Sequence, residues 1–73
     1  MKNILRNVKA YVNSQLTFSL QHPENTNEYM HNAYGAVELA VLCLDAETAT
    51  NLGDWWCEEI KPLFCEIVQN YYY

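Results

Sequence analysis

Residues 33–44 read Ala-Tyr-Gly-Ala-Val-Glu-Leu-Ala-Val-Leu-Cys-Leu and contain a single charged side chain, Glu38. If a helix runs through this stretch at 100° per residue, its strongly polar positions share one arc of about 40°. These positions are Asn27, His31, Glu38 and Asp45. The rest of the circumference, roughly 280°, is apolar or small apart from Asn32. Such a helix must be covered on most sides, so we expect it to be buried partly by its own chain and partly by something else.

Composition predicts one small domain that spans residues 1–73. The chain is 51% hydrophobic and 14% aromatic, which argues against disorder. A domain of this size buries only about 60% of its unfolded surface, so its stability margin is thin without metals, disulfides or self-association. The apolar run is shorter than the roughly 20 residues of a membrane-spanning helix, and polar residues interrupt any signal-peptide core. A soluble cytoplasmic protein is expected.

Hydrophobic periodicity predicts a first helix from residue 3 to about residue 15. Its apolar face consists of Ile4, Leu5, Val8, Tyr11 and Val12. Beyond it the pattern weakens, because Gln15 and Ser19 fall within the apolar stripe and residues 16–20 alternate like a strand. A lone strand would have no pairing partner, so a continuing or frayed helix is favoured.

A second helix is expected from about residue 26 to residue 44 or beyond. Pro23 marks the preceding linker, Asn25 is a candidate N-cap, and Glu28 is its capping-box partner. The sequence as a whole therefore predicts an all-α fold, a three-helix bundle with a long apolar central helix.

The third helix is predicted to span about residues 55–71. Gly53 suits a helix C-terminus and Asp54 the next N-cap, which leaves residues 45–51 as a fraying end or a loop. Pro62 interrupts the helical pattern, but the apolar face stays in phase across it. We therefore expect one Pro-kinked C-terminal helix.

Charge is distributed unevenly along the chain. Lys2, Arg6 and Lys9 give the first nine residues a charge of +3, whereas the remainder carries nine acids against Lys61 alone, or −8. This balance disfavours direct binding to nucleic acid, which depends on Lys and Arg at phosphates. Three basic residues on a short helix also bind acidic lipid only weakly, so no membrane association is expected.

Residues that could carry chemistry are few and scattered. Cys43, Cys57 and Cys65 lack the close spacing of zinc ligands, and buried free thiols in a reducing compartment are the favoured interpretation. His22 and His31 are nine residues apart, and no glycine-rich phosphate loop occurs. We expect no metal, no cofactor and no enzymatic activity.

Interaction surfaces are better supported. Gly35, Leu39 and Leu42 border the polar stripe of the second helix, on the side that two neighbouring helices are least able to cover. The two leucines belong either to the core or to a partner contact.

Trp55 falls among Glu59 and Glu66 on the polar face of the third helix. It is either an interface anchor, a role that favours tryptophan, or a local staple over the preceding connection. The candidate partner interface therefore comprises Leu39, Leu42, Trp55, Glu59 and Glu66.

These features favour a small acidic protein-binding module that self-associates as a homodimer or larger assembly. The alternative is an inhibitor of the kind encoded by phages and mobile elements, whose acidic surface occupies a nucleic-acid-binding groove on a host protein.

Overall fold

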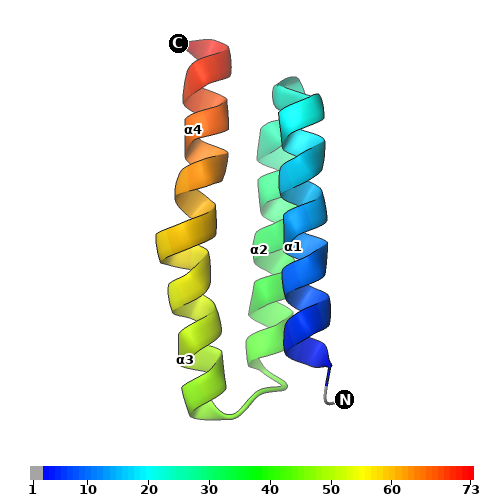
Figure 1. Cartoon of the computed structure of the whole chain (residues 1–73), viewed down its shortest axis with the longest axis vertical. Coiled ribbons are helices and arrows are strands. Elements are labelled where there is room, and N and C mark those ends of the chain that lie inside the picture. The colour runs from blue at the N-terminus through cyan, green and yellow to red at the C-terminus, as the bar shows by residue number, and fades with distance from the viewer. Residues whose placement is uncertain (1–2) are drawn as a thin grey trace.

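The computed structural model describes residues 3–73, and within that range the chain is helical and contains no strand. The elements are α1 (Ile4–Gln21), the 3-10 turn η1 (Pro23–Asn25), α2 (Thr26–Val41), α3 (Ala46–Trp55), the π-helical segment η2 (Trp56–Ile60) and α4 (Lys61–Tyr72). Figure 1 shows α3, η2 and α4 as one continuous helical column, which we call the third column, beside the antiparallel pair α1 and α2. The predicted all-α three-helix fold is confirmed. Lys2, one of the three basic residues among the first nine, lies outside the described residues.

Helix α1 continues through residues 16–20, as the rejection of a lone strand implied. Gln15 and Ser19 break the apolar pattern because they are polar residues in the core, with exposed fractions of 7% and 0%. The amide of Asn32 on α2 donates to Oε1 of Gln15 at 3.4 Å. This contact provides a hydrogen-bond partner for a buried polar side chain, which otherwise costs free energy.

The predicted capping box at the start of α2 is wrong. Asn25 occupies the N-cap position, but its side chain makes no capping hydrogen bond. Instead, the hydroxyl of Thr26 donates to the carbonyl oxygen of Pro23 at 2.8 Å and closes the turn. At its other end α2 stops at Val41, a few residues before the predicted end.

The third column begins at Ala46, well before the predicted start, because Asp45 is its N-cap. The backbone amide of Thr48 donates to Oδ2 of Asp45 at 3.1 Å, and the Thr48 hydroxyl donates to Oδ1 at 2.7 Å. Gly53 and Asp54 lie inside α3, so their predicted roles as helix end and N-cap are wrong.

The irregularity predicted at Pro62 takes the form of the π-helical segment η2. The amide of Lys61 donates to the carbonyl oxygen of Trp56, five residues earlier, rather than to the residue four before it. A proline inside an α-helix lacks the amide for this ladder and clashes with the carbonyl four residues before it. One wider turn just before Pro62 lets the column continue as α4.

The core lies between the α1–α2 pair and the third column. Its largest members follow one another every four residues along that column, which places them on one stripe facing the pair. They are Leu52, Trp56, Ile60 and Phe64. The fully buried hydrophobic residues of α1 and α2 are smaller: Val8, Val12, Ala33, Val37 and Ala40. Larger side chains of these two helices, among them Leu5, Leu16 and Met30, are partly buried and pack against this core.

The Asp45 cap should be visible in the pH dependence of stability. The Thr48 hydrogen bonds hold the pKa of Asp45 below its ordinary value, so the ionised carboxylate is favoured in the folded chain. A lowered folded-state pKa stabilises the fold above the unfolded pKa of about 4 and ceases to do so as the pH falls through the folded pKa. Asp45→Ala should therefore lower the thermal midpoint by a few degrees at pH 7 and have little effect near pH 2. Asp54→Ala is the matched control and should leave the midpoint unchanged at both pH values.

Candidate protein-interaction face

The rest of the chain covers only part of the apolar circumference of helix α2. Ala33, Val37 and Ala40 face the core and are at most 7% exposed. On the other side of the helix, Leu39 is 69% exposed and Leu42 is 80% exposed. Both leucines are therefore surface residues of the single chain.

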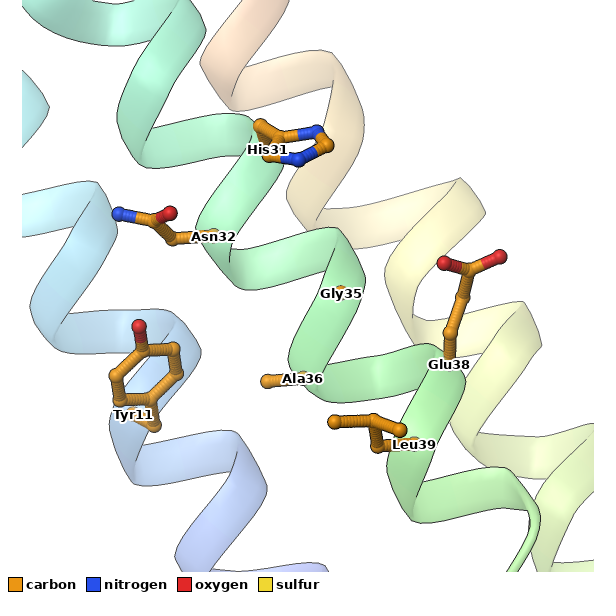
Figure 2. A pocket seen from close by; sticks show the side chains of 7 residues that line it. All are labelled: Tyr11, His31, Asn32, Gly35, Ala36, Glu38 and Leu39. Atoms are coloured by element: carbon orange, nitrogen blue, oxygen red, sulfur yellow. The ribbon is translucent and has the colours of Figure 1, made fainter.

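A shallow groove runs between α1 and α2 beside these leucines (Figure 2). Tyr11 of α1 forms one wall, and residues of α2 form the floor and the other wall. In Figure 2, Asn32, Ala36 and Leu39 extend from α2 on the side where Tyr11 lies, whereas Glu38 extends on the opposite side. Tyr11 is 43% exposed, so its predicted place in the apolar core face is only partly correct.

A second hollow continues along the same pair of helices toward the start of α1. It shares Ala36 and Leu39 with the first and adds Ile4, Asn7 and Cys43. Together the two hollows define a continuous surface, which we call the outer face. Its main apolar residues are Ile4, Tyr11, Gly35, Ala36 and Leu39. We include the exposed Leu42, which lines neither hollow but lies about two helical turns after Gly35 and so on the same stripe of the helix.

Gly35 leaves the helix backbone uncovered on the outer face. A Cβ atom built at this position would have no other heavy atom within 4 Å, apart from those of its own helix backbone and chain neighbours. A group from outside can therefore approach the helix closely here. His31 and Glu38 line the same hollow, and both side chains are exposed.

Trp55, Glu59 and Glu66 do not belong to the outer face, because they lie on the third column. Trp55 is half-buried against the core, and Nζ of Lys9 on α1 lies 5.0 Å from its ring centroid. This cation–π contact ties α1 to α3. Glu59 and Glu66 are exposed. The five predicted interface residues therefore occupy two separate places.

The three cysteines are exposed and free, so the expectation of buried thiols is wrong. Their positions follow from the helix register, which sends Leu52, Trp56, Ile60 and Phe64 inward and turns Cys57 and Cys65 outward. Within residues 3–73, no group of three or more His, Cys, Asp or Glu side chains is placed to hold a metal ion. In that range Nδ1 of His22 lies 3.6 Å from Oε2 of Glu24, a contact that is an ion pair only when the imidazole is protonated, and both side chains are about half exposed.

Comparison with known protein families, curated proteins and solved structures gives no match to this chain. Across the residues that the structure describes, no helix has the length and apolarity needed to cross a membrane.

Proposed function

We propose that this chain is a non-enzymatic protein-binding module that self-associates through the outer face. The observation that carries the proposal is the exposure of Leu39 and Leu42 at 69% and 80%, next to a groove lined by Tyr11 and Ala36. A contiguous apolar surface of this kind is typical of interaction sites, whereas single exposed apolar residues are ordinary.

Energetics favour covering this face. Full burial of a leucine side chain stabilises a complex by about 1.5–3 kcal/mol, and a symmetric dimer would bury two leucines from each copy. The chain's own core is small, because the fully buried hydrophobic residues of α1 and α2 are only valines and alanines, and the larger apolar side chains of these helices are buried only in part. Association would then add stability that the single chain lacks.

A binding role without catalysis fits the chemistry of the face. The groove contains one imidazole, one carboxylate and one phenol, from His31, Glu38 and Tyr11. Figure 2 shows the Glu38 carboxylate directed away from the side on which Tyr11 lies, so these two groups do not converge on one reacting atom. We also place the protein in the cytoplasm, because a reducing compartment preserves exposed free thiols such as Cys43.

The test of the proposal is the molar mass in solution as a function of protein concentration. Self-association predicts a mass that rises from that of one chain toward that of two as the concentration increases. A mass equal to one chain throughout would contradict it.

A second candidate, inhibition by imitation of nucleic acid, is favoured by the placement of the acids. All nine Asp and Glu side chains are exposed, and six of them lie in residues 45–66, where Lys61 is the one basic residue. An exposed acidic column could occupy a basic groove on a host protein.

The salt dependence of partner capture tests this second candidate. Binding through phosphate imitation should weaken about tenfold or more between low and high salt, because exposed charges are screened beyond about 10 Å at 0.1 M. Glu59→Gln combined with Glu66→Gln should weaken capture at low salt and leave binding at high salt unchanged. Capture that is equally strong at all salt concentrations would contradict phosphate imitation.

A further inference from the structure

We infer that the hollow between α2 and the third column, which we call the inner hollow, binds a small aromatic monoanion such as an aryl carboxylate. Its volume is about 480 Å³, within the roughly 300–1,000 Å³ of small-molecule sites. The groove beside Tyr11 lies elsewhere and shares only His31 with it. The inference goes beyond the proposed self-association and does not depend on it.

The inner hollow combines apolar surfaces with two basic side chains. Its lining includes Met30, His31 and Tyr34 of α2 and Trp56, Cys57 and Lys61 of the third column. The spacing of three or four residues along each helix brings these side chains to one side of it. Largely apolar walls with a few polar groups are the usual composition of a ligand site.

The ring of Tyr34 offers a surface for an aromatic ligand. Its centroid lies 5.7 Å from that of Trp56, and the two ring planes are tilted by 42°. Trp56 is 4% exposed and belongs to the core, whereas Tyr34 is 44% exposed. Trp56 therefore supports Tyr34 on one side, and the exposed part of the Tyr34 ring is open to a ligand. Aromatic rings pack favourably in offset and tilted arrangements of this kind.

The distribution of charge favours an anion in the inner hollow. Residues 10–73 contain one Lys or Arg side chain, Lys61, and two histidines, and Lys61 and His31 both line this hollow. None of the nine Asp and Glu side chains lines it. Within the described part of the chain, Lys61 forms no ion pair, although Glu58 is only three residues away. The Lys61 ammonium is therefore available to an anionic ligand.

The backbone beside Lys61 favours a ligand with a single charge. Phosphate groups are commonly held by the free amides at a helix N-terminus. Here the amide of Lys61 donates to the carbonyl oxygen of Trp56 within the helical column, and Pro62 has no amide. One ammonium next to an aromatic surface therefore suits an aryl carboxylate better than a nucleotide or inorganic phosphate.

Fluorescence titration with anilinonaphthalene sulfonate, an aromatic monoanion, tests the inference on the intact chain. The uncharged phenylnaphthylamine has the same rings and is the matched probe. We expect a dissociation constant on the order of 100 µM for the sulfonate. Lys61→Gln should weaken the sulfonate about two- to fivefold, as expected for an exposed charge pair, and leave the uncharged probe unaffected. Tyr34→Leu should weaken both probes about threefold.

Arg6→Gln is the control for Lys61→Gln. It removes the same charge from an exposed position on α1, outside the inner hollow, and should affect neither probe. Circular dichroism checks that each variant keeps its helical content. Equal binding of the sulfonate to the wild-type and Lys61→Gln proteins would overturn the inference, and so would equal weakening by Arg6→Gln.

Alkylation of the cysteines locates the bound probe. Cys57 lines the inner hollow and Cys43 lines the second hollow of the outer face, and both thiols are exposed and free. Saturating sulfonate should slow the alkylation of Cys57 by iodoacetamide severalfold and leave that of Cys43 unchanged, as measured by peptide mass spectrometry. Protection of Cys43 alone, or of neither thiol, would overturn the inference. A monomeric chain that protects Cys57 would contradict self-association and leave this site standing.

Discussion

Replacing Leu39 and Leu42 together with glutamine is expected to abolish self-association while leaving the fold intact. A symmetric dimer would lose four buried leucines, and at about 1.5 kcal/mol for each the dissociation constant should rise about ten-thousandfold. The single chain should tolerate the change because both side chains are mostly exposed. Sedimentation velocity measures the association, and circular dichroism checks the helical content.

Leu20→Gln is the matched control for this double variant. Leu20 is also a largely exposed leucine, at 67%, but it lies near the end of α1, away from the α2 residues Leu39 and Leu42. Its replacement should leave the dissociation constant unchanged. Equal weakening by Leu20→Gln would show that general surface hydrophobicity, and not the outer face, drives association.

Phe64→Ala is expected to have the largest effect on stability. The Phe64 ring is fully buried, with its centroid 5.9 Å from that of Trp56, whose own centroid is 5.7 Å from that of Tyr34. These three rings join α2 to η2 and α4. Truncation of a buried phenylalanine costs about 3–5 kcal/mol, while 73 residues at 0.05–0.15 kcal/mol each supply roughly 4–11 kcal/mol in total. The variant should be partly or wholly unfolded at 25 °C by circular dichroism and urea denaturation.

Leu63 provides the comparison for Phe64, because it is the preceding residue and is 42% exposed. Leu63→Ala should reduce the free energy of unfolding by about 1 kcal/mol, since much of its side chain already contacts water. A Phe64→Ala protein as stable as the Leu63→Ala protein would contradict the placement of Phe64 at the centre of the core.

The three-helix fold could be predicted from periodicity because each helix carries a continuous apolar stripe. Gln15 and Ser19 obscured the first stripe, since burial of polar side chains cannot be inferred from hydrophobicity. A hydrogen bond from Asn32 compensates for burying Gln15, and that contact depends on the approach of α2, which local sequence does not contain.

The third helix was predicted to begin near residue 55 and begins at Ala46, because Gly53 and Asp54 are residue types that often mark a helix boundary. A glycine inside a helix costs only about 1 kcal/mol, and the buried residues on either side outweigh it. A usable signal was present in the sequence: Leu52, Trp56 and Phe64 share one helical stripe that extends across Gly53. Given that stripe, Asp45 is the better N-cap candidate.

The candidate interface could be predicted in part. The excess apolar arc of α2 leaves Leu39 and Leu42 either in the core or at a partner contact, and the structure places both side chains at the surface. Tyr11 was expected in the core because periodicity shows which face of the helix a side chain lies on but not how deeply the side chain is buried. The cation–π contact of Trp55 with Lys9 was not predicted, because it joins residues of α1 and α3 that only the packing of the bundle brings together.

Sedimentation equilibrium of the wild-type chain, from low micromolar to near-millimolar concentration, tests the central claim most directly. If the outer face joins two copies, the weight-average mass should climb from that of one chain toward that of two, and the Leu39→Gln, Leu42→Gln protein should stay at one. A wild-type mass that remains at one chain over the whole range would contradict the account.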